Sequence, residues 1–424
     1  MAQLSDDCFA FGGELMPAAD ALARLAETTH TVAQPEEVSL SQAHGRVLAG
    51  DVLSTRDVPP HDNAAVDGWA VYFDDLNSDG DTRLPWSERI PAGRPLGHSA
   101  KRGMALRVFT GAPMPGGEDG APGPDTVLMQ EDCREQDGVV VIPPGIKLGA
   151  NRRFAGEDIK NGDVILAAGR RLKPQDIGLA ASVGLTSLSV YQPLKVAVFS
   201  SGDEVFEPGA ALPPGGIYDS NRFMVTALLE ALGCEVSDLG ILPDRFDAVR
   251  DALDSASGAH DVLITSGGVS TGEEDHVKAA VEALGHLHFW RLAIRPGRPI
   301  ALGQVGRVPF VGLPGNPVAV LVTFLRFARP LLLRLSGAAE TEPHHYPVRA
   351  DFDYKKKKGR REWLRARLRT LDDGSVAAEK FERGGAGILS SAVFADGLIE
   401  LPEDVTRVER GMTVDFLPFN EMMR

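Results

Sequence analysis

Cysteine is scarce in this sequence, and no stretch has the length or pattern of a membrane segment. The three cysteines, Cys8, Cys133 and Cys234, are far apart and show no metal-ligand spacing, so we expect reduced, buried thiols. No apolar run is long enough to span a bilayer. The first residues include acids and lack the basic region and apolar core of a signal peptide. These absences predict a cytoplasmic protein with no membrane partner.

Positive charge is also in short supply. The chain has 44 Lys and Arg against 59 Asp and Glu, a formal net charge of −15, which argues against nucleic acid as the main partner. A local basic pocket for an anionic ligand is still compatible with this charge. No convincing pair of nucleophile and base is visible, and four histidines lack metal-like partners: His260, His276, His286 and His288. Chemistry would therefore depend on carboxylates, or on a metal and anions aligned by charge.

The pattern of apolar residues predicts an α/β plus β protein with several domains. A chain of 424 residues is too long for one ordinary core, and its 43% hydrophobic content is that of a globular protein. Strands alternate with helices from about residue 194 to 335, which indicates a mostly parallel sheet covered on both faces. Short apolar runs separated by glycine and proline predict a small inserted β domain over about 70–158. Further strands are expected after residue 336, at 346–352, 362–371, 388–394, 397–401 and 412–416.

The stretch 261–275 combines a buried strand, two glycines and three acids. A buried apolar strand ends at Ser266, Gly267 and Gly268, and the acids Glu273, Glu274 and Asp275 follow before a helix. Open α/β sheets bind ligands beyond such strand ends, and glycine lets the backbone approach a phosphate closely. The acids would repel that anion unless a divalent cation lay between them. The stretch therefore predicts a phosphorylated ligand held with Mg²⁺; the alternative is a tight turn with solvated acids.

A second strand end repeats this design. Ser201, Gly202 and Glu204 follow the apolar run 195–199, and Asp244 follows the strand-like segment 240–243. Parallel strands bring their carboxyl ends to one edge of a sheet, so these residues can line one pocket with Ser266. Gathered carboxylates make sense as Mg²⁺ ligands, whereas single surface acids are usually only solvated.

Cationic residues and a rigid turn could serve an anion. Strand alternation puts Arg291 and Arg295 on one face, where two guanidinium groups could hold a diphosphate or a tetrahedral oxyanion; solvated arginines at a sheet edge are the alternative. The turn 312–317 contains Pro314 and Pro317 and offers backbone amides at a helix N-terminus. The basic run 355–358 is explained at least as well by a solvated hairpin tip as by a ligand contact.

Seven short motifs occur in the order found in the molybdopterin molybdenumtransferase family, the bacterial counterpart of the gephyrin E domain, and the chain resembles that family over almost its whole length. The motifs are HDNAAVDG (61–68), TGAPMP (110–115), GEDI (156–159), SGDE (201–204), SGGVS (266–270), RPGRP (295–299) and GLPGNP (312–317). The ordered set is far more specific than any one of its members.

The resemblance implies a homodimer of elongated subunits. One domain would have the three-layer α/β/α fold shared with molybdopterin adenylyltransferases, beside an inserted β-rich domain and a C-terminal β-barrel-like domain. The expected boundaries are 1–28 for an N-terminal helix packing with the α/β domain, 29–48 with 160–183 for a linker or dimerisation domain, 49–159 for the inserted domain, 184–335 for the α/β molybdopterin-binding domain and 336–424 for the C-terminal domain.

The resemblance also implies an activity: Mg²⁺-dependent insertion of molybdate into adenylyl-molybdopterin, with release of AMP. Molybdopterin adenylyltransferase and apo-molybdoenzymes would be protein partners. The implied catalytic residues are Asp62, Glu204, Asp244 and Asp275, of which the last three would also hold the metal. The implied substrate-binding residues are Thr110, Ser266, Gly267, Gly268, Ser270, Arg291, Arg295, Pro314, Pro317, Ser390 and Ser391. Asp62 and Thr110 belong to the inserted domain, which allows a pocket completed across the dimer.

Some positions depart from the family pattern. Ala64 stands where the family has serine, Val66 where it usually has methionine, and Arg291 and Arg295 where lysine is common. Arginine keeps the charge but changes size and hydration. The acids are kept, so we expect an active enzyme. Two alternatives stay open: an adenylyltransferase or nucleotide pyrophosphatase on the same α/β fold, which would need neither the inserted nor the C-terminal domain, and a non-catalytic scaffold of the gephyrin type.

Overall fold

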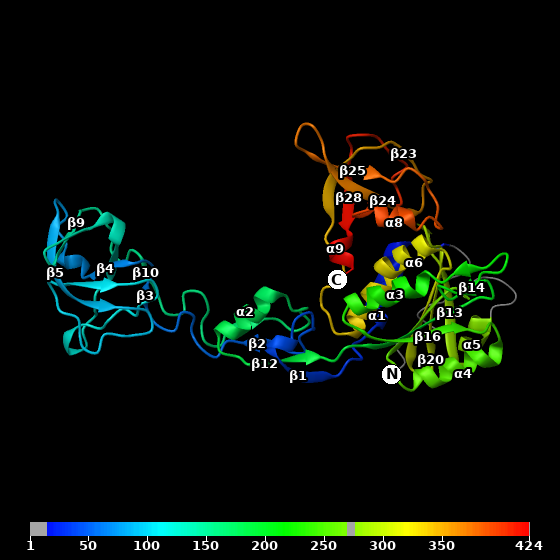
Figure 1. Ribbon diagram of the computed structural model, residues 1–424, viewed down its shortest axis with the longest axis horizontal. Coiled ribbons are helices and arrows are strands. Elements are labelled where there is room, and N and C mark those ends of the chain that lie inside the picture. The colour runs from blue at the N-terminus through cyan, green and yellow to red at the C-terminus, as the bar shows by residue number, and fades with distance from the viewer. Residues whose placement is uncertain (1–14, 269–275, 424) are drawn as a thin grey trace.

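The computed structural model describes residues 15–268 and 276–423, and over these the molecule is elongated (Figure 1). An inserted β unit lies at one end, a narrow linking unit follows, and an α/β domain lies at the other end with a C-terminal barrel stacked on it. Cys8, Ser270, Asp275 and their neighbours lie outside the described residues. No helix in the described ranges is long and apolar enough to cross a membrane.

The α/β domain is built on a six-stranded sheet in the order β16-β13-β17-β21-β20-β18. Its first four strands run parallel, β20 is antiparallel to β21, and β18 is in turn antiparallel to β20. The strands are β13 (Lys195–Ser201), β16 (Glu235–Leu242), β17 (Val262–Ser266), β18 (Gly285–Arg291), β20 (Pro299–Val305) and β21 (Val308–Leu313). A small parallel pair, β14 (Val205–Phe206) and β15 (Ile217–Tyr218), follows β13.

Helices cover both faces of this sheet because its central strands are apolar on both sides. Val196 and Val198 of β13 face one core, while Ala197 and Phe199 face the other. On the first face pack α3 (Asn221–Ala231), α6 (Pro317–Thr323) and α7 (Arg329–Leu335), with α1 (Ala18–Thr28); on the second pack α4 (Phe246–Ser257) and α5 (His276–Leu284). The predicted three-layer α/β/α arrangement is confirmed.

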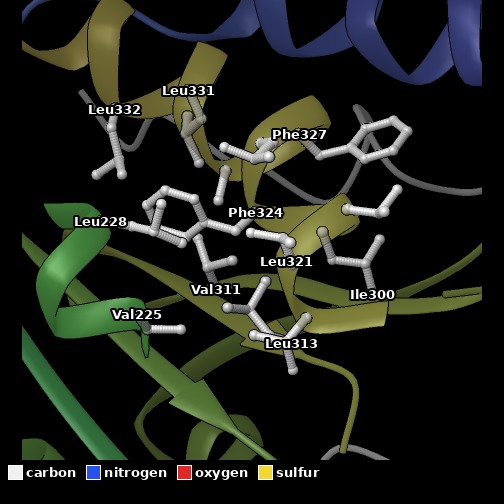
Figure 2. Packing of buried hydrophobic residues seen from close by; sticks show 14 of the residues in the cluster. Val225, Leu228, Ile300, Val311, Leu313, Leu321, Phe324, Phe327, Leu331 and Leu332 are labelled. Carbon is white, nitrogen blue, oxygen red and sulfur yellow. The ribbon is translucent and has the colours of Figure 1, made fainter. Parts of the chain in front are cut away.

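The larger core lies between the sheet and the long helical segment that follows β21. Figure 2 shows Val311 and Leu313 of β21 pointing at Leu321 and Phe324, while Leu331 and Leu332 lie further along the same segment. A π-helical turn over 324–328 joins α6 to α7, so the helical segment is continuous as predicted for 318–335.

The linking unit consists of two short antiparallel ladders and one helix. Its elements are β1 (Pro35–Ser39) paired with β12 (Ser187–Tyr191), β2 (Val52–Leu53) paired with β11 (Val164–Leu166), and α2 (Pro174–Ser182). The sequence boundaries at 49 and 184 assign β2 to the inserted domain and β12 to the α/β domain, whereas both strands pair inside the linking unit. Short strands such as these have too little apolar pattern to show their partners.

The inserted unit is β-rich, with a six-stranded sheet in the order β7-β4-β6-β5-β9-β8. Its strands are β4 (Gly68–Val71), β5 (Thr82–Ile90), β6 (Ala105–Val108), β7 (Thr126–Met129), β8 (Arg134–Gln136) and β9 (Val139–Ile142), with a separate ladder of β3 (Asn63–Ala64) and β10 (Arg152–Arg153). Separate apolar clusters gather around this sheet, one containing Val108 and the other Trp69.

The C-terminal region forms a closed five-stranded barrel, because β26 pairs with β24 as well as with β28. The barrel strands are β22 (Tyr346–Ala350), β24 (Arg361–Thr370), β25 (Val376–Lys380), β26 (Gly397–Leu401) and β28 (Thr413–Pro418). The further elements are β19 (Ile294–Arg295), which adds to β24, the ladder of β23 (Tyr354–Lys355) with β27 (Arg407–Val408), and the helices α8 (Ser390–Phe394) and α9 (Phe419–Met422).

The expected strand over 388–394 is wrong, since most of that stretch is the helix α8. The Ser391 amide donates to the Ile388 carbonyl at 3.0 Å, and its hydroxyl donates to the same oxygen at 2.6 Å. These two bonds close a helical turn. The run ILSSAVF is too short for its apolar pattern to distinguish a strand from a helix.

A buried ionic contact joins the barrel to the α/β domain. The Arg326 side chain lies in the π-helical turn, is 2% exposed, and its Nη2 is 3.4 Å from Glu400 Oε2 of the barrel. The Trp363 indole donates to the same carboxylate at 2.7 Å, and the Trp363 ring meets Phe327 edge-on with centroids 6.2 Å apart. Both side chains are buried, so this contact ties the two domains together, and Arg361 of β24 compensates the same carboxylate at 3.1 Å.

The Arg326→Met variant tests this attachment. It keeps most of the apolar volume but removes one of the two cations facing Glu400, so we expect the junction to lose about 2 kcal/mol of stability. Hydrogen exchange of β24 and β26 during urea titration would measure it. The control is Arg349→Gln, which breaks an ion pair whose side chains are 51% and 54% exposed and should cost less than about 1 kcal/mol. Equal protection of β26 in all three proteins would contradict the role of Arg326.

Candidate functional site

The carboxyl ends of the parallel strands meet at one edge of the α/β sheet. In the register of the sheet Ser200 lies opposite Ser266, Ser201 opposite Leu242, and Ser266 opposite Leu313. The segments 201–204, 242–244, 266–268 and 313–317 therefore start side by side. The expectation that these strand ends share one edge is confirmed by the pairing of the strands.

Glycine is required at the end of β17. Gly267 and Gly268 have φ values of +85° and +65°, and the Gly267 amide donates to the Leu313 carbonyl at 3.2 Å. A Cβ atom on Gly268 would lie 2.7 Å from Val277 Cγ2, so no larger residue fits without displacement. The end of β17 therefore carries no side chain at Gly267 and Gly268, so a ligand can approach the backbone closely there.

Two serine hydroxyls beside these glycines have no hydrogen-bond partner among the residues that the structure describes. Ser200 Oγ and Ser266 Oγ are buried, and in the described part of the chain neither makes a hydrogen bond. Unpaired buried hydroxyls are costly, so they commonly mark a place where another group binds. The strand ends therefore combine open backbone with unused hydroxyl donors, which suits a phosphate.

Two of the predicted acids lie at the same edge. The Asp244 side chain is half-buried and accepts a hydrogen bond of 3.4 Å from Ser201 Oγ. Glu204 is exposed, and its carboxylate folds back so closely that a Cβ on Gly202 would be 2.8 Å from Oε2. Within the described ranges no group of three His, Cys, Asp or Glu side chains is arranged to hold a metal. The third predicted ligand, Asp275, lies outside those ranges.

Asp62 and Thr110 lie elsewhere, in the inserted unit at the far end of the molecule (Figure 1). Asp62 forms an ion pair with Arg152 and accepts the Ala155 amide at 2.8 Å. Burial alone would raise the pKa of Asp62, but these two contacts outweigh it and hold the pKa below its usual range. Thr110 donates from its amide and hydroxyl to Asp67 at 2.8 and 2.9 Å. Within one subunit these residues do not join the strand-end site.

The expectation that Arg291 and Arg295 share one strand face is wrong. Arg291 ends β18 in the α/β sheet, whereas Arg295 belongs to β19, which pairs with β24 of the barrel. The residues between them are buried, and the Ala293 amide donates to the Met16 carbonyl at 2.8 Å. Simple alternation fails because the chain leaves one sheet and joins another within three residues.

Arg295 instead joins a cluster of cations on the barrel, formed with Arg365 and Lys380 and called the cation cluster below. Arg365 Nε donates to Ser391 Oγ at 2.9 Å and Nη2 to the Gly385 carbonyl at 3.2 Å. Burial lowers the pKa of Arg365, and the charge of Arg295 lowers it further. Burial likewise lowers the pKa of Lys380, with a further contribution from Arg365. Concentrated, poorly compensated positive charge favours an anionic ligand.

Sequence reasoning missed Arg365 and Lys380. Arg365 is one of four arginines in β24, REWLRARLRT, and nothing in that string shows that it is buried while Arg367 and Arg369 are exposed. Of the two predicted serines, Ser391 is fully buried and accepts the hydrogen bond from Arg365, while Ser390 is exposed. Arg295 keeps a weak link to the buried Glu362, with Nη1 to Oε2 at 3.9 Å.

The turn 312–317 connects the strand edge to the cation cluster. Pro314 is buried, Pro317 begins α6, and the side-chain Nδ2 of Asn221 donates to the Gly315 carbonyl at 2.7 Å. The Val318 amide donates to the Ala386 carbonyl of the barrel at 2.9 Å. The prediction that the amides at the start of this helix are free to bind an anion is therefore wrong for Val318. That bond docks the glycine-rich loop 384–387 on the start of α6, and a Cβ on Gly384 would lie 3.7 Å from Arg295 Nη2.

Comparison with known proteins places this chain in a family. Three family models match consecutive parts of the chain: the MoeA N-terminal region (domain I and II) over 16–184, a probable molybdopterin binding domain over 197–334, and the MoeA C-terminal region (domain IV) over 347–419. The chain is 38% identical over 392 residues to the molybdopterin molybdenumtransferase of Haemophilus influenzae, which covers 92% of this chain and 95% of the relative. The chain belongs to the molybdopterin molybdenumtransferase family.

Other members of the molybdopterin molybdenumtransferase family agree with this assignment. The Nostoc sp. enzyme is 34% identical and the match covers 89% of this chain and 87% of the relative. The crystal structure of the molybdopterin biosynthesis moeA protein from Pyrococcus horikoshii OT3 superposes with a TM-score of 0.80 at 28% identity, covering 96% of this chain and all of that one. The protein is therefore a transferase of molybdenum cofactor biosynthesis, with a molybdopterin-related substrate.

The Asp62→Asn variant tests the environment of Asp62. The pKa of Asp62 in the folded protein lies below its ordinary value near 3.9. The ionised carboxylate therefore stabilises the fold fully at pH values above about 3.9, and this stabilisation is lost as the pH falls through the lower pKa of the folded state. We expect the variant to be less stable by about 1 kcal/mol at neutral pH, because charge-assisted hydrogen bonds are lost. The difference from wild type should shrink towards zero as the pH falls below about 4.

Hydrogen exchange of β3 and β10 between neutral and acidic pH would measure this loss. Asp74→Asn, in an exposed turn of the same unit, removes the same charge and is the control. A difference between Asp62→Asn and wild type that does not change with pH would contradict the role given to the ionised carboxylate.

Proposed function

We propose that this protein inserts molybdenum from molybdate into adenylyl-molybdopterin, with release of AMP. The main support for the proposal is that the strand ends of the α/β sheet lie next to the cation cluster of the barrel. Open backbone, unpaired hydroxyls and two carboxylates lie at the strand ends, and the loop 384–387 connects them to the cation cluster of the barrel. A phosphorylated ligand and an oxyanion can be bound next to each other there.

The strand ends would bind the phosphates of the substrate. The Ser266 hydroxyl offers a donor without charge, and the positive-φ backbone of Gly267 and Gly268 lets a phosphate oxygen approach closely. Glu204 and Asp244 supply hard oxygen ligands, and Mg²⁺ is usually held by one or two carboxylates together with substrate phosphates. The residues therefore fit Mg²⁺, which would neutralise charge on the diphosphate while its phosphorus–oxygen bond breaks. Asp275 and Ser270 remain proposed members of this site on sequence grounds.

The cation cluster would bind molybdate. Arg365 bonds only to a serine hydroxyl and a backbone carbonyl, so its charge has no carboxylate within ion-pair distance in the described part of the chain. A guanidinium offers paired donors that match two oxygens of a tetrahedral anion. Ser391 orients Arg365, and Arg295 adds a second guanidinium. Arg291 is exposed and stays a proposed contact at the rim.

The overall reaction balances without any oxidant or reductant. Water adds to the adenylyl phosphorus, the bond to the molybdopterin phosphate breaks, and AMP leaves. Two dithiolene sulfurs replace two oxygens of molybdate, which depart as two waters after taking up two protons from the thiols and two from solution. Molybdenum stays in its hexavalent state. The protein's contribution is to align the two anions while neutralising their charge.

We further propose a cytoplasmic homodimer in which a second subunit completes the site. Asp62 and Thr110 lie at the far end of their own chain, so they could act only on the site of another copy. Molybdopterin adenylyltransferase would supply the substrate and apo-molybdoenzymes would receive the product. Neither nucleic acid nor a membrane is proposed as a partner.

The decisive experiment measures AMP. Purified protein is incubated with adenylyl-molybdopterin, Mg²⁺ and molybdate, AMP is quantified by chromatography, and the product is offered to an apo-molybdoenzyme. We expect AMP release to depend on both Mg²⁺ and molybdate. Release without molybdate would favour an adenylyltransferase or pyrophosphatase, and no release under any condition would favour a scaffold.

The Arg365→Met variant tests the molybdate site. Loss of a charge-assisted contact should raise the molybdate concentration for half-maximal AMP release about 10- to 100-fold. Arg365→Lys should recover part of the affinity, because charge returns without paired donors. Arg367→Met, two residues along the same strand and paired with Glu379 at 2.7 Å, is the control and should behave as wild type. Unchanged molybdate dependence in Arg365→Met would rule out its role.

A further inference from the structure

A concentration of lysine and arginine projects from the barrel between β23 and β24. It comprises Lys355, Lys356, Lys357, Lys358, Arg360 and Arg361, and is called the basic tip below. The chain turns at Gly359, whose φ is +83° and whose amide donates to the Glu403 carbonyl at 2.9 Å. Lys356 is 7% exposed, and its Nζ donates to the same carbonyl at 3.3 Å. Lys356 is therefore part of the structure of the turn.

The remaining cations of the basic tip fall into two groups. Arg360 Nε lies 2.6 Å from Glu362, and Arg361 pairs with Glu400 and Glu403, both at 3.1 Å. By contrast, Lys355, Lys357 and Lys358 are exposed, and none has a carboxylate within ion-pair distance in the part of the chain that the structure describes. These three lysines carry the uncompensated charge of the basic tip.

The basic tip adjoins the cation cluster. Tyr354, which precedes Lys355 in β23, lies with its hydroxyl 3.4 Å from Arg295 Nη1. Lys380 Nζ lies 5.9 Å from the centroid of the Tyr354 ring. The Arg361 amide donates to the Ala293 carbonyl at 2.8 Å, beside the same crossing of the chain. The basic tip and the cation cluster are therefore neighbours on the barrel, with Tyr354 and the buried Glu362 between them (β23 and β24 in Figure 1).

This local charge opposes that of the whole chain. A net charge of −15 repels an anionic substrate on approach. At physiological salt, however, charges are screened beyond about 8 Å, so cations close to the site dominate the field that a nearby anion experiences. Clefts bordered by one sign of charge raise the local concentration and the association rate of the oppositely charged ligand.

We propose that Lys355, Lys357 and Lys358 form a capture surface that guides the polyanionic, phosphorylated substrate into the site beside the cation cluster. The inference rests on the proposed function, since adenylyl-molybdopterin carries several negative charges. The three lysines act on the approach of the substrate and not on the bond-breaking step. They therefore contribute to kcat/KM, in a salt-dependent manner, and not to kcat.

The test is a triple variant, Lys355→Gln with Lys357→Gln and Lys358→Gln, which leaves Lys356 in place to preserve the turn. With free adenylyl-molybdopterin at about 20 mM salt we expect kcat/KM to fall about tenfold with kcat unchanged. Raising the salt to about 150 mM should slow the wild type much more than the variant. The control, Lys101→Gln with Lys147→Gln and Lys195→Gln, removes the same charge from exposed positions elsewhere and should behave as wild type.

Two outcomes with active enzyme would overturn the inference: an unchanged kcat/KM and salt dependence in the triple variant, or an equal loss in the control. A defect seen only when molybdopterin adenylyltransferase delivers the substrate would also overturn it and assign the basic tip to a protein partner. If the wild type releases no AMP, the proposed function fails, and binding of inorganic pyrophosphate, measured by calorimetry at about 20 mM salt, decides the inference alone. Weaker pyrophosphate binding in the triple variant than in the control would support it, and equal binding would overturn it.

Discussion

The parallel pairing of Ile294–Arg295 with β24 is the contact on which the composite site depends. The chain leaves the α/β sheet after Arg291, adds two residues to the barrel and returns to the sheet at Pro299. The barrel is thereby joined by backbone hydrogen bonds to a segment that cannot move without disturbing β18 and β20. The buried contact of Arg326 with Glu400 holds the same two domains together at a second point. The groups proposed to bind phosphate and the groups proposed to bind the oxyanion lie on different domains, so their separation is set by these two attachments.

The site divides opposite charges between the two domains. Carboxylates and neutral donors come from the ends of the parallel strands, while guanidinium and ammonium groups come from the barrel. A single fold would have to bury both kinds of charge close together, where they would neutralise each other as ion pairs. On separate domains Arg365 keeps its charge free for a ligand because the hydroxyl of Ser391 and a carbonyl orient it without compensating it.

What the sequence could predict followed from local rules. The strand ends at Ser201 and Ser266 were predictable because buried parallel strands carry an apolar pattern and share one edge. The order of motifs led to the family, which the relatives then confirmed. Arg365 was not predictable, because its burial depends on how the barrel closes. The placement of Arg295 was mistaken because alternation assumes one continuous strand. The pairing of β12 with β1 was not predictable, because the two strands are about 150 residues apart in the chain.

The narrow linking unit holds the inserted unit far from the α/β domain (Figure 1). The inserted unit is connected to the linking unit by two passes of the chain, which continue from β2 and β11, strands of two and three residues. A small rotation about this narrow connection becomes a large displacement at Asp62, since the displacement grows with distance from the pivot. The position of the Asp62 carboxylate therefore depends on the torsional stiffness of a few residues far from Asp62. Substitutions near Leu53 or Val164 would change where this carboxylate lies without altering any residue next to Asp62.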